Sequence, residues 1–286
     1  MSNPVFSSSD VFGDRAGRAG RAARTVTLGG PAAAGTDAAA LEQLYASPAA
    51  TAVQTGRMTY DDVIVKTAGL LALVVAAAAV TWFTAPALAL PAALIAFVLA
   101  LVVQFRRTPS PALIIAYAVA EGVALGGFSY VVQNVVDGQG GAVDAQPIVL
   151  QALLATAATF VATLVLFSSG RIRVTARATR YFLIAGAGYL LFSVTNFFIT
   201  IFGGSGGGWG LRSDVTVAGL PLGIVVGVLG VLLATYALVM DFDAIKRGVE
   251  GGAPARAAWT AAFGLVVTIV WLYVEMLRIL AIFRDR

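Results

Sequence analysis

From residue 67 onward, the chain consists of seven apolar segments separated by short polar connections. The hydrocarbon core of a bilayer is about 30 Å thick, so a helix of roughly 17–25 residues crosses it. The sequence is 12% charged, whereas a soluble domain is about 25% charged. We therefore predict an all-α polytopic membrane protein with seven transmembrane helices, at 67–83, 87–105, 111–132, 148–167, 181–202, 217–240 and 259–283.

Residues 1–57 have a different composition, with small and polar residues and an arginine at every third position from Arg15 to Arg24. A segment with so few large apolar residues cannot offset the entropy of ordering, so we predict a disordered cytoplasmic tail. The tail is either simply solvated or tethered weakly to anionic lipid by its arginines. The predicted domains are this tail, 1–57, and a seven-helix transmembrane domain, 58–286.

Basic residues fall in alternate connections between the apolar segments. Connections on the other side carry Arg212 together with three aspartates. Because cytoplasmic loops are enriched in Lys and Arg, we expect the N-terminus in the cytoplasm and the C-terminus outside. The basic set that follows the second, fourth and sixth segments is Arg106, Arg107, Arg171, Arg173, Arg177, Arg180, Lys246, Arg247 and Arg256.

Missing residue types exclude several classes of enzyme. The chain has no histidine and no cysteine, which removes Ser-His proteases, His-ligated zinc hydrolases and thiol chemistry. The segment 259–283 has no lysine for the Schiff base of a rhodopsin-like pigment. Intramembrane aspartyl proteolysis would need a GxGD pattern, which WLYVEM lacks. We therefore expect no enzymatic activity and no cofactor.

Two carboxylates inside the last two apolar segments are the main candidates for a functional site. Asp241 ends the run LLATYALVM, and Glu275 interrupts LVVTIVWLYV. A charged side chain at the bilayer centre costs about 2.5–3.5 kcal/mol, so such residues are usually paired, protonated or in contact with water. If Asp241 and Glu275 meet, they cannot both ionise cheaply, and we expect the pair to share one proton near neutral pH and lose it as pH rises. An ionised pair could bind Ca²⁺ transiently, since hard cations prefer oxygen ligands.

Four further charged residues have secondary roles in this prediction. Arg278 lies three residues after Glu275 and either pairs with it or extends toward the outer surface, which would leave Glu275 free for Asp241. Arg106 either reaches Asp241 or is an ordinary cytoplasmic anchor. Glu121 lies in the third segment, where a bond to a neighbouring helix is expected, and Asp243 is expected at the interface.

Three short motifs in order, AYAVAEG, LVMDFDAIKRG and WLYVEMLRIL, resemble the Bax-inhibitor family, also called transmembrane Bax-inhibitor-motif proteins. The resemblance covers about residues 60–284 and excludes the tail. It implies a bacterial member with seven helices, the last surrounded by the others, in the bacterial cytoplasmic (inner) membrane. It also implies a pH-sensitive calcium leak channel gated by Asp241 and Glu275, with Arg106 latching Asp241. The helix-seven position is commonly aspartate in the family and is glutamate here.

We derive two functional hypotheses. The first is a pH-sensitive cation leak channel, with Ca²⁺ as the permeant ion and Asp241, Glu275 and Arg106 as its gate. The alternative is a membrane-embedded regulator that binds other membrane proteins, such as a membrane-bound AAA protease. Neutralising the carboxylates would abolish the pH dependence of flux through a leak channel, whereas a regulator would keep its function.

Overall fold

The computed structural model describes residues 56–106, 110–138, 147–202, 209–217 and 219–284. Within these residues, seven helices are long and apolar enough to cross a membrane. They are α4 (Tyr60–Thr84), α5 (Ala89–Phe105), α6 (Pro111–Gly138), α7 (Ile148–Ser168), α8 (Ala176–Phe202), α10 (Leu222–Glu250) and α11 (Ala257–Arg284). A 3-10 turn, η1 (Pro86–Leu88), joins α4 to α5. The predicted all-α polytopic membrane fold is confirmed.

The connection between α8 and α10 contains a small structured unit. It consists of α9 (Leu211–Asp214) and the strands β1 (Thr216–Val217) and β2 (Leu220–Pro221), which pair antiparallel. Our prediction that the sixth membrane helix starts at residue 217 was wrong, because these residues pair as a hairpin. The amide of Leu222 donates to the carbonyl of Val215 at 2.7 Å and closes the hairpin beneath the start of α10.

Helix α10 also continues ten residues beyond its predicted end at residue 240. Polar side chains stabilise this extension through i,i+4 ion pairs. Asp243 pairs with Arg247 at 2.9 Å, and Lys246 lies 3.9 Å from Glu250. As a consequence, Asp241 lies in the interior of a continuous helix rather than at its end.

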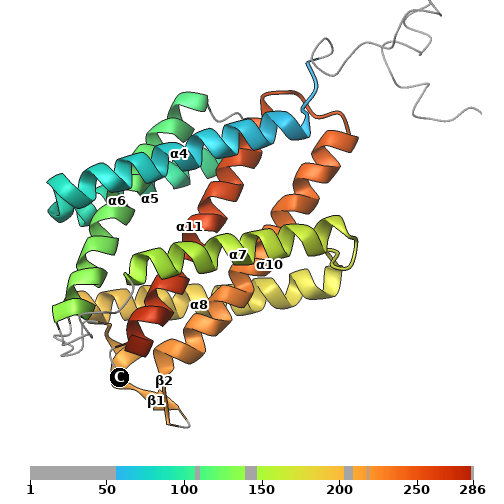
Figure 1. The fold of residues 1–286 in the computed structure, drawn as a ribbon. Coiled ribbons are helices and arrows are strands. Elements are labelled where there is room, and N and C mark those ends of the chain that lie inside the picture. The colour runs from blue at the N-terminus through green and yellow to red at the C-terminus, as the bar shows by residue number, and fades with distance from the viewer. Residues whose placement is uncertain (1–55, 107–109, 139–146, 203–208, 218, 285–286) are drawn as a thin grey trace, which may run out of the picture. The chain divides into compact units, whose positions relative to one another are not determined.

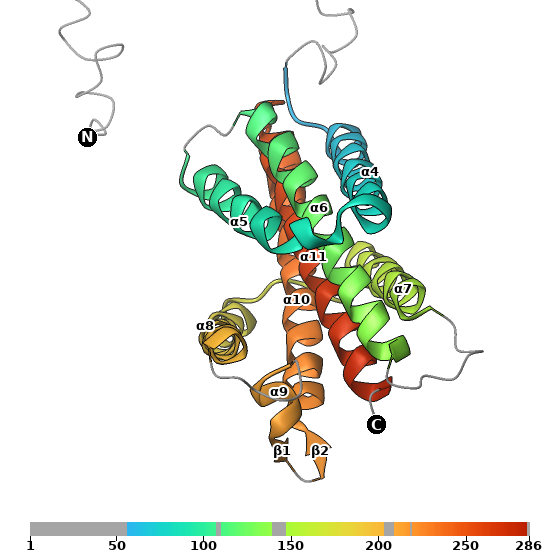
Figure 2. The same cartoon turned by 90° about the vertical axis from the view of Figure 1, so that its left-hand side faces the viewer.

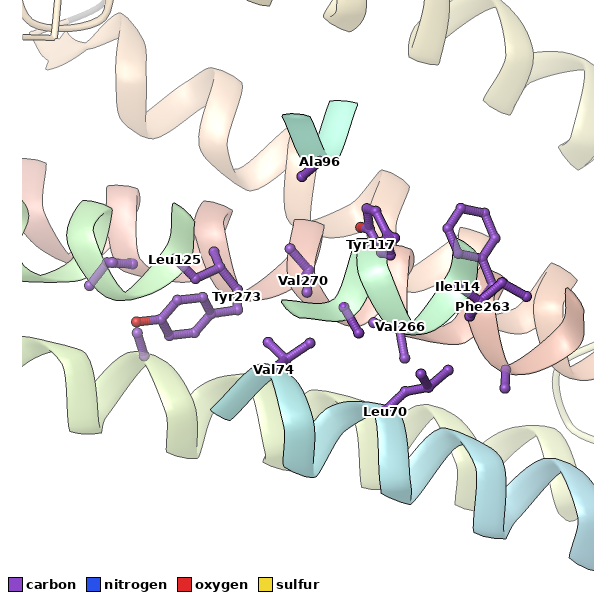
Figure 3. Packing of buried hydrophobic residues seen from close by; sticks show 14 of the residues in the cluster. Leu70, Val74, Ala96, Ile114, Tyr117, Leu125, Phe263, Val266, Val270 and Tyr273 are labelled. Carbon is purple, nitrogen blue, oxygen red and sulfur yellow. The ribbon is translucent and has the colours of Figure 1, made fainter. Parts of the chain in front are cut away.

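The last helix is the centre of the bundle, as the family resemblance implied. Helix α11 packs against α10, α4, α7 and α6, and α5 packs on α6 (Figures 1 and 2). Its buried side chains meet those of α4 and α6 in the core that Figure 3 shows. There, Tyr117 of α6 makes an edge-to-face contact with Phe263 of α11, with ring centroids 5.0 Å apart. The polar residues Thr268 and Glu275 of α11 are therefore shielded from lipid by the surrounding helices.

Glycines let α6 approach α4 closely. A Cβ at Gly126 would overlap the backbone of Ala78, and a Cβ at Gly122 would overlap that of Val74. By contrast, Gly186 of α8 has no neighbouring atom within 4 Å of its Cβ position. Glycines thus allow close packing on α6, as small residues do between helices surrounded by lipid, while Gly186 on α8 does not.

The described part of the chain begins with a segment held against the α10–α11 loop. Arg57 forms an isolated bridge with Pro254, and the amide of Met58 donates to the carbonyl of Ala253 at 2.7 Å. Of the predicted tail, residues 1–55 lie outside the described residues, while Gly56 and Arg57 belong to the folded domain.

Candidate functional site

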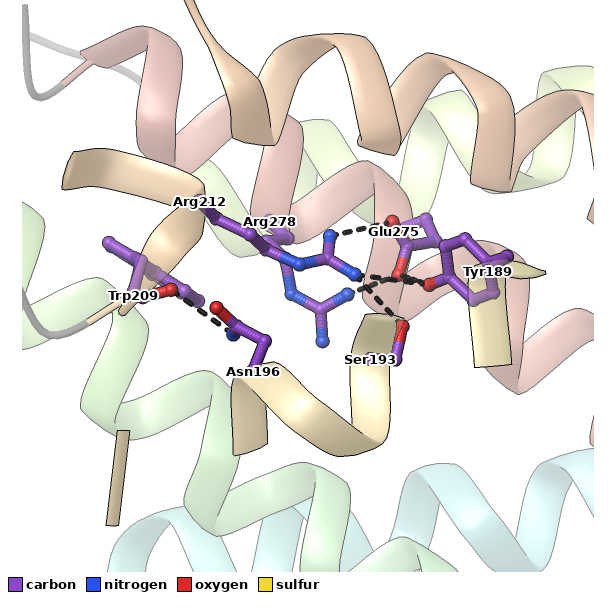
Figure 4. A network of polar contacts seen from close by, with 7 residues as sticks. All are labelled: Tyr189, Ser193, Asn196, Trp209, Arg212, Glu275 and Arg278. Carbon is purple, nitrogen blue, oxygen red and sulfur yellow. Dashed lines mark hydrogen bonds and ion pairs between the residues drawn. The ribbon is translucent and has the colours of Figure 1, made fainter. Parts of the chain in front are cut away.

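The most buried charged group in the described chain is the carboxylate of Glu275, which is 1% exposed. Three side chains bind it (Figure 4). The hydroxyl of Tyr189 donates to Oε1, Arg278 forms an ion pair with Oε1, and Nη1 of Arg212 lies 3.4 Å from Oε2. The i,i+3 pair between Glu275 and Arg278 is thus formed, and Arg212 adds a second cation from another element.

Close approach of the backbone makes room for this cluster on two sides. On α10, a Cβ at Gly230 would lie 2.9 Å from Oε2 of Glu275, so any larger residue there would displace the carboxylate from this position. On the other side, Gly210 turns the chain into α9 with a φ of +60°, which glycine adopts at little cost. That turn places Arg212 beside the bundle interior.

Arg212 is the least expected member of the cluster. It comes from the short connection after α8, yet it is only 3% exposed. Its Nη2 donates to Ser193 Oγ at 3.2 Å and lies 3.4 Å from the Tyr189 hydroxyl. The guanidinium also lies over the rings of Tyr189 and Phe192, at 5.8 and 5.5 Å from their centroids, where cation–π attraction operates.

The polar side of α8 supplies the rest of the cluster. Tyr189, Ser193 and Asn196 follow an i, i+4, i+7 spacing and share one face of the helix. Nδ2 of Asn196 donates to the carbonyl of Trp209 at 3.2 Å, which ties α8 to the segment leading into α9. Among the described contacts, two guanidinium groups face one carboxylate, so the cluster carries net positive charge.

Asp241 forms a separate polar site on the α10–α11 seam. The hydroxyl of Thr268 donates to its Oδ2 at 2.7 Å, and a Cβ at Gly264 would lie 3.5 Å from its Oδ1. No ion pair between Asp241 and a basic side chain occurs in the described residues. Its described partner is therefore a neutral hydroxyl, whereas Glu275 is bound by two cations.

The structure does not bring Asp241 and Glu275 together. Thr268, the partner of Asp241, precedes Glu275 by seven residues, which is about 10 Å along α11. Gly230, which lies against Glu275, precedes Asp241 by eleven residues, or about 16 Å along α10. In this arrangement the two carboxylates are too far apart to share one proton. They are also too far apart to bind one Ca²⁺ together, because its ligands lie about 2.3–2.6 Å from the ion.

The other predicted site residues lie apart from both centres. Arg106 is exposed at the C-terminal end of α5, with no described bond to Asp241. Asp243 pairs with Arg247. Glu121 is half-buried on α6, and none of the described residues forms a hydrogen bond or ion pair with it. No group of three acidic, His or Cys side chains able to hold a metal occurs among the described residues.

Sequence reasoning missed Arg212, Tyr189, Ser193 and Thr268. Two signals in the sequence pointed to the first three of them. Arg212 is a basic residue in connections whose other charged residues are aspartates. Tyr189 and Ser193 lie four positions apart, a helical spacing, inside an apolar run. Thr268 carried no such signal, because an isolated threonine in a membrane helix usually bonds its own backbone, as its contact with the Gly264 carbonyl at 3.1 Å shows.

Fold and site together define a multi-pass membrane protein with a buried carboxylate on its central last helix and a half-buried one on the neighbouring α10. A model of the family described as Bax inhibitor 1 like matches residues 3–285. The chain belongs to this family. The match includes most of the N-terminal segment, which corrects our expectation that the resemblance starts near residue 60. No curated protein matches the chain.

Proposed function

We propose that this protein is a pH-sensitive cation leak pathway, with Ca²⁺ as its permeant ion, in the cytoplasmic membrane of a bacterium, with the N-terminus in the cytoplasm. The observation that carries the proposal is the carboxylate of Asp241, which lies inside a membrane-spanning helix and whose described partner is a hydroxyl. Such a group changes charge with pH and, once ionised, offers oxygen ligands to a hard cation.

The charged surroundings of Asp241 support its role as the pH-sensitive group. Helix α7 has no charged residue, and α11 has none before Glu275. Within the described chain, Lys66 of α4 is engaged by Asp62 at 3.2 Å. On the other elements packed against α10, the charged side chains that the structure describes are Asp61, Asp62 and Lys66 on α4, Arg177 and Arg180 on α8, Arg212 on α9, and Glu275, Arg278 and Arg284 on α11. No described ion pair links any of them to Asp241.

The Glu275 cluster supports a second element, a positive barrier. The two positive charges of Arg212 and Arg278 exceed the one negative charge of Glu275, so a cation approaching along α11 meets net positive charge. In this proposal the cluster keeps the pathway closed, and movement of Arg212 with α9 opens it. The sensor and the barrier are thus separate groups on the same central helix, rather than one carboxylate pair.

The sign of the pH response follows from the sensor. As pH rises, Asp241 loses its proton and attracts cations, so flux increases with pH. As pH falls, the neutral carboxylic acid no longer attracts them, and flux decreases.

The test is calcium entry into proteoliposomes loaded with a calcium dye, between about pH 5 and 8, the range of physiological switches. We expect flux that rises with pH in the unmodified protein and a flat response in Asp241→Asn. Glu250→Gln is the matched control, since it removes an exposed carboxylate from the same helix and should retain the pH response. A pH response that survives in Asp241→Asn would refute the sensor assignment.

Absence of flux at every pH would refute the leak pathway itself. The alternative hypothesis, a regulator bound to other membrane proteins, would then be tested by capturing membrane partners through the N-terminal segment.

A further inference from the structure

A cavity of about 780 Å³ lies between α4 and α7 and is open to the outside of the bundle, since its lining includes exposed side chains such as Val75, Phe83 and Leu153. Helices α6 and α11 form its floor. Val74, Leu125, Val270 and Tyr273, labelled in Figure 3, all line it and come from three different helices. Its size falls within the range of about 300–1,000 Å³ that small-molecule sites occupy.

The cavity presents a hydrocarbon surface. Its few polar side chains bond to protein groups. The Ser129 and Tyr273 hydroxyls lie 2.7 Å apart, Thr156 donates to the Ala152 carbonyl at 2.7 Å, and Gln133 accepts from the Val149 amide at 3.4 Å. None of the described lining residues is charged. Such walls are suited to hydrocarbon, because they offer water few free polar partners.

The dimensions of the cavity match one leaflet of the bilayer. On α4, its lining runs from Leu71 to Phe83, which lie twelve positions apart, or about 18 Å along the helix. Half of a hydrocarbon core of about 30 Å is about 15 Å. At one end, the lining includes Gln133 and Pro147, which flank the α6–α7 connection at the limit of the apolar spans.

We propose that this cavity binds one acyl chain of a membrane phospholipid, with the headgroup at the α6–α7 end. The helices that line the cavity are long and apolar enough to span the membrane, and the cavity opens between them, so lipid is the hydrocarbon available to fill it.

Chain binding has a consequence for the central helix. Val270 and Tyr273 of α11 are 8% and 7% exposed, so lipid on the outer surface of the bundle does not reach them, whereas a chain in the cavity does. Contact between lipid and α11 is therefore the distinguishing signature of the site. The inference goes beyond the proposed ion pathway and does not depend on it.

The test uses the full-length protein in vesicles of phosphatidylethanolamine and phosphatidylglycerol containing a trace of phosphatidylcholine with a diazirine on its acyl chain. After photolysis, labelled peptides are mapped by mass spectrometry. We expect label on the 269–273 segment of α11 as well as on exposed positions such as Leu190 and Leu191 of α8. Label confined to outer helix faces, with none on α11, would overturn the proposal.

Two variants fill the cavity from opposite walls, Ala79→Phe on α4 and Ala157→Phe on α7. Label on α11 should be lost in both, while label on α8 stays at its original level. The matched controls are Ala76→Phe and Ala158→Phe, which change exposed alanines of the same helices that do not line the cavity. Label on α11 that persists in both filled variants would also overturn the proposal, and the mapping of the unmodified protein stands as a test even if a variant fails to fold.

Discussion

The Glu275 cluster allows a double-mutant test of how its charges are balanced. Glu275→Gln keeps the shape of the side chain but leaves Arg212 and Arg278 without a counter-charge. Removing one partner of a buried ion pair typically costs about 3–5 kcal/mol. Arg212 is 3% exposed and its charge cannot be hydrated in place, so we expect a cost in this range.

Arg212→Met should cost less. It retains the length of the side chain, and Glu275 keeps the Arg278 ion pair and the Tyr189 hydroxyl. Without Arg212, Oε2 of Glu275 and the Ser193 hydroxyl each lose a hydrogen-bond donor, and an unsatisfied buried group costs about 1–3 kcal/mol. The double variant removes the surplus cation together with the carboxylate, so it should be no less stable than Glu275→Gln alone.

The free energy of unfolding of the two single variants and the double variant is measured on purified protein in detergent. Tryptophan fluorescence reports the unfolding, because the chain has four tryptophans and no cysteine for a thiol-reactive dye. Glu250→Gln serves as the exposed control and should leave stability unchanged. Strict additivity of the two single changes, or a Glu275→Gln protein as stable as the original, would show that the cluster is not electrostatically coupled.

Two further predictions concern α11 and the α4–α6 contact. Thr268→Val removes the hydroxyl that stabilises ionised Asp241, so the rise of calcium flux should move to higher pH, and Thr268→Ser should restore it. An unchanged flux profile in Thr268→Val would contradict this. Gly126→Ala should destabilise the bundle by about 1–3 kcal/mol, because its Cβ overlaps the Ala78 backbone. In the same unfolding assay, Gly186→Ala should be neutral or stabilising by up to about 1 kcal/mol, and equal losses at both glycines would contradict the packing argument.

The sequence predicted the membrane helices well because hydrophobic length alone decides whether a segment can span a bilayer. It predicted their ends less well, since helical hydrogen bonding continues past the apolar run. Helix α10 shows this, because the charged residues after Asp241 remain helical through their i,i+4 pairs.

The separation of Asp241 from Glu275 could have been worked out from the sequence once the helix ends were known. Asp241 precedes the loop residue Gly251 by ten positions, and Val266 follows Arg256 by ten positions. When two antiparallel helices are joined by a short loop, residues equally far from the loop lie side by side, so Asp241 lies beside Val266. This position is two residues from Thr268 and nine residues from Glu275. Arg212 could not be placed in this way, because its position depends on how α9 folds back onto α8 and α10.

The bridge between Arg57 and Pro254 joins the start of the membrane domain to the loop that connects the two carboxylate-bearing helices. The amide of Ala255 also donates to the carbonyl of Gly56 at 2.8 Å. A mechanical pull on the chain that precedes Gly56 would therefore act directly on the α10–α11 loop, without passing through α4. This loop lies ten residues from Asp241, so tension on the N-terminal segment has a short route to the α10–α11 seam.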